Sequence, residues 1–181
     1  MEAERIVAHH EAGHLFAAYR LRIPFSGRNV ITIIPSEDYS GVFKHKNILR
    51  GVDLEWDGSN RSRMKMERVV QVCLAGIEAQ RQYDPSSIRY GESPRDWDGG
   101  DDYHRALDLI DHFVSGPRET EAYLVLLRIR AESLVQTPIN WECIQRVAEF
   151  LAKEKMLSGK RAIEIIQTTI RGYGTPTLKL E

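Results

Sequence analysis

The stretch VAHHEAGHLFAAY, residues 7–19, places three histidines and a glutamate in a run of alanine and large apolar side chains. Residues 3–20 contain good helix formers, with Gly13 as the single interruption, and Pro24 and Gly27 close the segment. Apolar side chains cover most of the circumference of this expected helix, which predicts that it is buried. The stretch therefore predicts a buried helix.

His10, Glu11 and His14 match the HExxH pattern. Histidines four positions apart share one helix face and can both ligate zinc, and the glutamate then lies beside the water molecule on the metal. Burying these groups without partners would cost about 1–3 kcal/mol for each unsatisfied group, and a bound cation removes that cost. The pattern therefore predicts a catalytic zinc site.

The same residues also allow an interpretation without a metal. His10 and His14 would then be core histidines that hydrogen-bond to backbone groups. His9 is treated separately, because it shares a helix face with Glu2 and Arg5. It is predicted to point into solvent and not to bind the metal.

A catalytic zinc usually has three protein ligands and a water molecule, so a third donor is needed downstream. In a helix that begins near Asp101, the side chain of Asp102 lies over Ala106 and Ile110 on the apolar face. Asp101 and His104 are predicted to face water. Asp102 is the inward-facing candidate, but helix capping also explains an acidic residue in a first turn.

The remaining segments predict a mainly α fold, a helical bundle with a small β element beside the HExxH helix. The segments RNVITIIP (28–35) and YSGVFKH (39–45) are predicted to form a hairpin or two strands of a small sheet. Apolar periodicity and breaker residues predict the further helices at 62–83, 101–115, 117–135, 139–156 and 160–170.

The length of 181 residues predicts a single domain over 1–181. Within this domain, residues 1–83 are predicted to contain the HExxH helix, the β element and a second helix. A polar loop follows at 84–100. The helical part at 101–181 contains the third predicted metal ligand, Asp102. Cys73 and Cys143 each lie within an apolar helical pattern and are predicted to be buried, reduced thiols.

The composition is typical of a soluble globular protein, with 42% hydrophobic residues, 28% charged residues and a formal net charge of -1. The basic residues are interleaved with acidic ones, so nucleic acid is not a predicted partner. The sequence contains no apolar run of the roughly 18 residues that a membrane span needs. The N-terminus lacks the layout of a secretory signal, so a cytoplasmic location is expected.

The chain resembles the peptidase domain of the FtsH-type, AAA-associated zinc metalloproteases. The similar segments are the HEAGH core, VITIIPSEDYSGVFKH (30–45), CLAGIEAQ (73–80), GGDDYHRALDL (99–109) and RVAEFLAKEKMLSGKRAIEII (146–166). The resemblance selects Asp102 as the third ligand, and it implies that His10, His14 and Asp102 hold zinc while Glu11 activates water.

The chain also departs from that family. It contains no GxxxxGK[ST] phosphate loop, and only nine residues precede the motif, so it is expected to be an excised domain or a free-standing relative. A separate or upstream AAA ATPase is a candidate partner, and the family's hexamers make a homo-oligomer a further candidate. Gln80 and Arg81 replace an acidic pair, and Gln80, on the face of Cys73 and Gly76, is predicted to look toward the site.

The predicted function is that of a zinc-dependent metalloendopeptidase that hydrolyses flexible or unfolded polypeptides, with Glu11 as the general base. The segment 39–45 is expected to pair edge-on with an extended substrate. Two alternatives stay open. One is a catalytically silent FtsH-like domain for assembly or substrate capture, in which Gln80 is a sign of decay. The other is an ImmA/IrrE-type HExxH protease that cuts one regulatory protein, which matches less well outside the motif.

Overall fold

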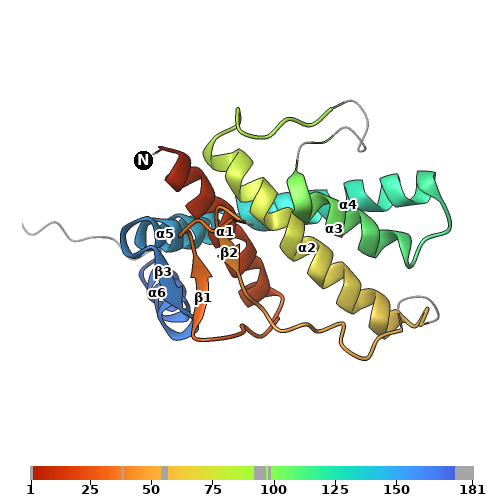
Figure 1. Ribbon diagram of the computed structural model, residues 1–181, viewed down its shortest axis with the longest axis horizontal. Helices are drawn as coiled ribbons and strands as arrows, with labels where there is room; N and C mark the ends of the chain where they lie inside the picture. The colour runs from red at the N-terminus through yellow and green to blue at the C-terminus, as the bar shows by residue number, and fades with distance from the viewer. Residues whose placement is uncertain (1, 38, 54–56, 92–96, 98, 174–181) are drawn as a thin grey trace, which may run out of the picture.

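The computed structural model describes residues 2–37, 39–53, 57–91, 97 and 99–173. This part of the chain is mainly helical with a small antiparallel sheet, which confirms the predicted mainly α fold with a small β element (Figure 1). The elements in chain order are α1 (Glu2–Arg20), β1 (Asn29–Thr32), β2 (Val42–Phe43), α2 (Asn60–Tyr83), α3 (Gly100–Asp111), α4 (Pro117–Gln136), α5 (Pro138–Glu154), β3 (Met156–Ser158) and α6 (Gly159–Gly172).

Helix α1 lies at the centre, and most of it is buried, as its apolar circumference predicts. Figure 1 shows α2, α3 and α4 on one side of it and α5, α6 and the sheet on the other. Ala8, Ala12, Leu15 and Phe16 have no exposed surface. A single apolar cluster runs from α1 through the other helices, so the position of α1 decides where every neighbour packs.

The sheet has the strand order β2-β1-β3, with β1 antiparallel to both neighbours. Ile31 lies opposite Phe43 of β2, which confirms the predicted pairing of these two segments. Thr32 also lies opposite Met156 of β3, a strand that the sequence pattern did not predict. Because β3 has only three residues, its own sequence carries little strand signal, and pairing with β1 creates it.

Two predicted helix ends are wrong. The helix predicted at 139–156 stops at Glu154, because Lys155 adopts a left-handed conformation with φ 66° and turns the chain into β3. The helix predicted at 101–115 stops at Asp111. Within the predicted loop at 84–100, residues 92–96 and 98 lie outside the described residues.

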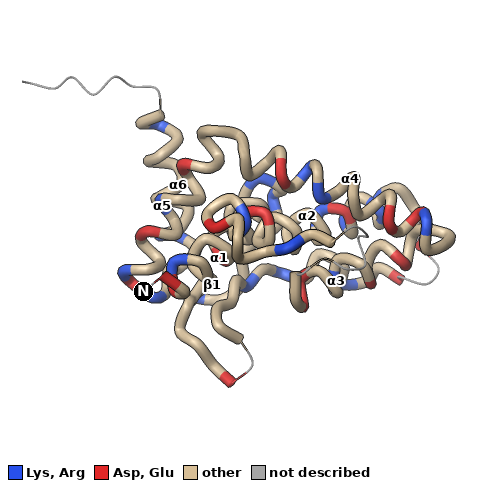
Figure 2. Tube along the Cα trace, turned by 90° about the horizontal axis from the view of Figure 1, so that it is seen from above, with Lys and Arg blue, Asp and Glu red and all other residues tan. Residues whose placement is uncertain are grey.

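Other expectations hold. Cys73 and Cys143 are both buried and free. Of the helices in the described ranges, none combines the length and apolar character that crossing a membrane requires. Along α4, arginines are interspersed with glutamates (Figure 2).

The packing of α1 on α2 is unusually close at two glycines. A Cβ atom at Gly13 would lie 2.5 Å from the carbonyl oxygen of Ala75 and 2.6 Å from the Cβ atom of Ala79. A Cβ atom at Gly76 would lie 2.3 Å from Cε1 of His14. The two helices can reach this separation only because both positions lack a side chain.

Gly13→Ala is expected to lower the free energy of unfolding by about 1–3 kcal/mol, because the new methyl group meets the backbone of α2. This expected loss of stability is opposite in sign to the effect of helix propensity, because alanine is about 1 kcal/mol more favourable than glycine inside a helix. Urea unfolding measures the change. Gly58→Ala is the control, because a Cβ atom there meets nothing within 4 Å. A Gly13→Ala protein as stable as the wild type would contradict the close packing.

Candidate metal centre

Three side chains from two helices bring their donor atoms together. Nε2 of His10 lies 2.9 Å from Nε2 of His14, and Oδ2 of Asp102 lies 3.0 Å and 2.9 Å from these two nitrogens. The histidines are one turn apart on α1, and Asp102 is in the first turn of α3. This group could hold a metal ion, and it consists of the three residues that the sequence predicted as ligands.

The two histidines are oriented by hydrogen bonds from their other ring nitrogens. Nδ1 of His14 lies 2.7 Å from the carbonyl oxygen of Val72, and Nδ1 of His10 lies 2.9 Å from Oε1 of Gln80. A carbonyl oxygen can only accept, so Nδ1–H of His14 donates and its Nε2 carries the lone pair. With the same assignment at Gln80, both Nε2 lone pairs point at the centre of the group.

The arrangement fits a bound cation. Two imidazole lone pairs and a carboxylate oxygen converge, and three acceptors repel one another unless a proton or a metal ion lies between them. Two ligand atoms of a tetrahedral zinc ion lie about 3.3 Å apart, given bonds of about 2.0–2.1 Å. The observed separations of 2.9–3.0 Å need only a small outward adjustment.

The pKa values of these groups point the same way. Burial alone would lower the pKa of His14, but the charge and hydrogen bond of Asp102 outweigh burial and raise it to about 9. Burial opposes ionisation of Asp102, yet its two histidine neighbours hold the pKa of that carboxyl well below its usual range. The centre of the group therefore favours a positive charge.

Glu11 lies beside the metal group and is only 6% exposed. Burial raises the pKa of Glu11, while the nearby charges of His14 and His10 and a hydrogen bond from the backbone of Phe43 oppose that rise. A Cβ atom at Gly41 would lie 2.9 Å from Oε1 of Glu11, so the missing side chain leaves room for this carboxylate. A carboxylate with a raised pKa is suited to accept a proton near neutral pH.

Glu11, His14 and Asp102 border a cleft of about 180 Å³, whose other wall is formed by Gly41 and by Val42 and Phe43 of the edge strand β2. His45 and Arg105 also line it, and the sequence pattern did not assign a role to either. Their positions in the sequence could have indicated a place near the site, because His45 follows β2 by two residues and Arg105 follows Asp102 by three. Asp101 and His104 are exposed, as predicted.

Cys73 also lines the cleft but does not belong to the metal group. Burial and then the negative charge of Asp102 raise the pKa of its thiol to about 12, so the thiol stays protonated at neutral pH. The structure thus agrees with the prediction of a reduced, buried cysteine at this position.

Gln80 faces the site, as predicted. Although it replaces an acidic residue of the family that the chain resembles, its amide oxygen still accepts the hydrogen bond of His10. The support of the histidine is therefore kept, with a neutral acceptor in place of a charged one.

The prediction that His9 points into solvent is wrong. Its side chain is 7% exposed and its ring stacks on Tyr83, with ring centroids 3.8 Å apart and 13° between the planes. Nδ1 lies 2.7 Å from the carbonyl oxygen of Arg5, and Trp141 of α5 lies at 5.8 Å. The last turn of α2 and the start of α5 cover this face of α1, which no local pattern could show. His9 is not part of the metal group.

Comparison with protein-family models and with curated protein sequences finds no match. The geometry of the site therefore carries the functional proposal, and the FtsH-type resemblance stays a sequence-based prediction.

Gln80→Leu is expected to weaken zinc binding by about 10–100-fold, because Nδ1–H of His10 loses its acceptor and the ring loses its orientation. Gln80→Glu keeps an oxygen at the same place and is expected to bind zinc at least as tightly as the wild type. Competition with a chromophoric chelator measures both affinities. Equal affinities in the leucine and glutamate variants would show that this hydrogen bond does not support the site.

Proposed function

We propose that the protein is a zinc-dependent metalloendopeptidase acting on flexible or unfolded polypeptides. One observation carries the proposal: three acceptor atoms converge beside a buried glutamate, in a cleft with a strand edge as its wall. His10, His14 and Asp102 would hold the ion. Zinc bound by these residues supplies Lewis-acid activation of water and of the substrate carbonyl group.

The chain's own residues then handle the protons. Glu11 takes the proton of the attacking water molecule and delivers it to the leaving amine nitrogen. The position of Glu11, next to His10 on α1 and against Gly41, holds its carboxylate at the cleft. Val72 and Gln80 keep the two imidazoles in the tautomer that leaves Nε2 free to bind the ion.

The edge strand supports a polypeptide as the substrate. Among the described residues, β2 pairs with β1 alone, and residues 41–43 line the cleft beside Glu11. An extended peptide could add to this edge through its backbone, which gives binding that depends little on side chains. Folded substrates would first need unfolding, the task for which a separate or upstream ATPase is the candidate partner.

Metal content is the first test of the proposal. Protein purified without chelator is expected to hold about one zinc ion per chain, as measured by elemental analysis. Asp102→Asn is expected to lose or weaken that zinc, because the charged ligand is gone. Asp101→Asn is the matched control from the same helical turn and is expected to keep it, since Asp101 is exposed. An Asp102→Asn protein with the full zinc content would contradict the assignment.

Glu11→Gln tests the reaction itself. This variant is expected to keep its zinc but to cleave an unfolded protein substrate at least about 10²–10⁴-fold more slowly, because the proton acceptor is lost. Chelator is expected to abolish cleavage by the wild type, and added zinc to restore it. Full activity in the zinc-loaded Glu11→Gln protein would rule out the proposed role of this carboxylate.

A further inference from the structure

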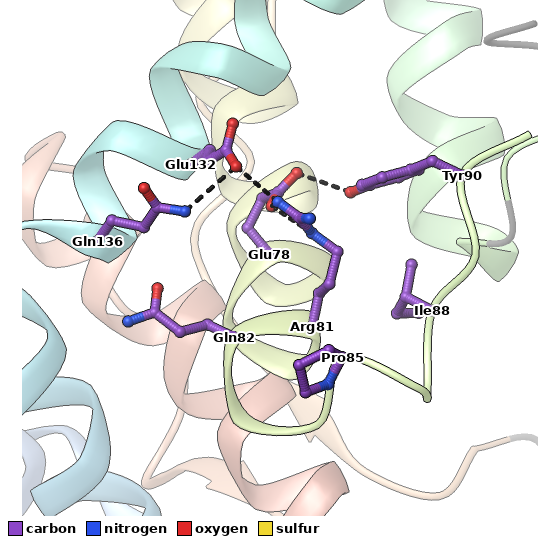
Figure 3. A pocket seen from close by; sticks show the side chains of 8 residues that line it. All are labelled: Glu78, Arg81, Gln82, Pro85, Ile88, Tyr90, Glu132 and Gln136. Carbon is purple, nitrogen blue, oxygen red and sulfur yellow. Dashed lines mark hydrogen bonds and ion pairs between the residues drawn. The ribbon is translucent and has the colours of Figure 1, made fainter. Parts of the chain in front are cut away.

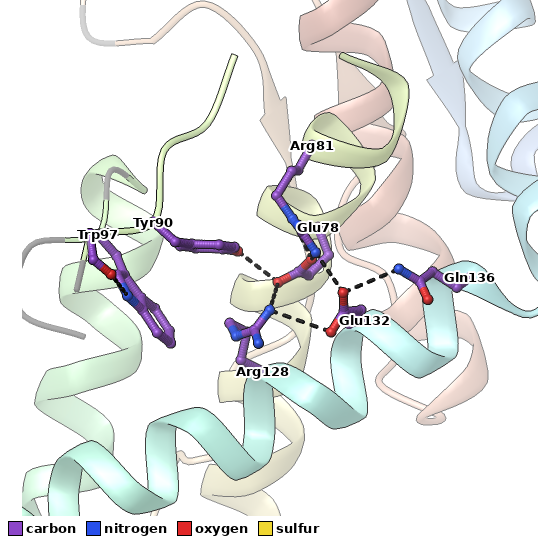
Figure 4. Close-up of polar contacts among 8 residues, drawn as sticks. Glu78, Arg81, Tyr90, Trp97, Arg128, Glu132 and Gln136 are labelled. Atoms are coloured by element: carbon purple, nitrogen blue, oxygen red, sulfur yellow. Dashed lines mark hydrogen bonds and ion pairs between the residues drawn. The ribbon is translucent and has the colours of Figure 1, made fainter. Parts of the chain in front are cut away.

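A second buried polar group lies on the other face of α2. Glu78 is only 2% exposed and accepts hydrogen bonds through both carboxylate oxygens. Oε1 lies 2.6 Å from the hydroxyl of Tyr90, and Oε2 lies 2.9 Å from Nη2 of Arg81 (Figure 3). Arg128 of α4 reaches Oε1 at 3.3 Å (Figure 4). We call the set of Glu78, Arg81, Tyr90, Trp97, Arg128 and Glu132 the Glu78 cluster.

The Glu78 cluster is electrically balanced and tightly interlocked. Arg81 also binds Glu132 at 2.6 Å, and Arg128 lies 3.4 Å from the same carboxylate, so two arginines face two glutamates. Both guanidinium groups lie over the ring of Tyr90, at 5.1 Å and 5.0 Å from its centroid. The loss of either arginine would leave negative charge without a partner beside the buried carboxylate of Glu78. These ion pairs therefore favour one arrangement of the cluster.

The cluster fastens one segment of chain in particular. Glu78 and Arg81 belong to α2 and Arg128 and Glu132 to α4, but Tyr90 belongs to the connection between α2 and α3. Figure 3 shows the Tyr90 hydroxyl reaching Glu78 beside a cavity of about 410 Å³. The connection is therefore tied to the helix pair by a buried hydrogen bond.

Aromatic contacts link the connection between α2 and α3 to the first turn of α3. The ring of Trp97 lies over Arg128 at 5.3 Å and 4.7 Å from the ring of Tyr90. It also lies 5.9 Å from the ring of Tyr103, which is 2% exposed. A Cβ atom at Gly99 would lie 2.7 Å from that of Tyr103, so the backbone just before α3 is pressed against the helix.

Local sequence contributes little to holding this helix start. The N-cap residue of α3 is Gly99, which makes no side-chain capping bond, and Gly100 has a φ of +56°. Asp102 follows directly and is the only ligand of the metal group that does not come from α1. The place of its carboxylate is therefore set by tertiary contacts, both those of the connection and Tyr103 and those of the buried face of α3 that contains Ala106, Leu109 and Ile110.

We propose that the Glu78 cluster is the positioning device for the metal ligand Asp102. By holding Tyr90 and Trp97 against α2 and α4, it sets the start of α3 so that Oδ2 of Asp102 reaches both histidines. Glu78, Tyr90 and Arg128 are positioning residues, since they act through Asp102 and do not contact the metal group. This inference rests on the proposed metal site.

The chain offers a matched control for the test. Glu67 of α2 accepts a hydrogen bond from the hydroxyl of Tyr123 and lies 3.2 Å from Nη1 of Arg130, so it has the same kinds of partner on the same pair of helices. Tyr123 belongs to α4 and not to the connection before Asp102. Tyr90→Phe and Tyr123→Phe therefore remove the same atom from similar clusters, and only the first touches the segment before the ligand.

The full chain is used for two measurements on each variant. The zinc dissociation constant is expected to rise about 10–100-fold in Tyr90→Phe and to stay within about twofold in Tyr123→Phe. With cobalt in place of zinc, the visible absorption of the ion reports its ligand geometry, and we expect the spectrum to change only in Tyr90→Phe. Urea unfolding of the metal-free proteins shows how much stability each variant loses. Arg128→Met and Arg130→Met form a second pair, to be used if Tyr90→Phe does not fold.

The outcomes separate the two proposals. Weaker zinc binding and an altered cobalt spectrum in Tyr90→Phe or Arg128→Met, but not in the controls at comparable stability, would support the positioning role. Affinities that follow stability alone, or that do not change in either pair, would overturn it and leave the metal site intact. A wild-type protein that binds neither ion would overturn the metal site and the positioning role together.

Discussion

The contact between α1 and α2 is the constraint on which the rest of the structure depends. Gly13 lets α1 approach the backbone of α2, and Gly76 leaves the space that the imidazole of His14 fills. At this separation Nδ1 of His14 reaches the carbonyl oxygen of Val72, a helix backbone group that a more distant helix could not offer. Close packing of the two helices and the orientation of Nε2 of His14, a candidate metal ligand, therefore depend on the same two glycines.

Helix α2 contributes residues or backbone groups to two polar clusters. The two clusters differ in the source of the positive charge that compensates their buried carboxylates. The Glu78 cluster contains its own cations, so two arginines neutralise two glutamates within the protein. The metal group has two imidazole lone pairs and a carboxylate, and its positive charge must come from a proton or from an ion. One cluster is neutral as folded, and the other calls for a cation. That contrast distinguishes a structural ion network from a candidate active site.

Much of the fold and of the metal group could be predicted from the sequence. The periodicity of apolar residues indicated the helices, and the spacing of His10 and His14 placed both on one face of α1. Helical phase turned Asp102 toward the interior, where the structure has it. The errors arose where distant segments cover or extend an element. His9 is covered by Tyr83 and Trp141, and β3 exists only because β1 lies beside it.

The sequence by itself determined which residues are chemically suited to hold a metal and which helix faces they occupy, because a helical repeat of 3.6 residues is a local property. Only the tertiary structure decided that Asp102 lies within 3.0 Å of both histidines, that Gln80 and Val72 orient them, and that β2 walls the cleft. These contacts join residues up to 92 positions apart. Their geometry depends on how whole helices pack, and no local pattern in the chain encodes a distance between helices.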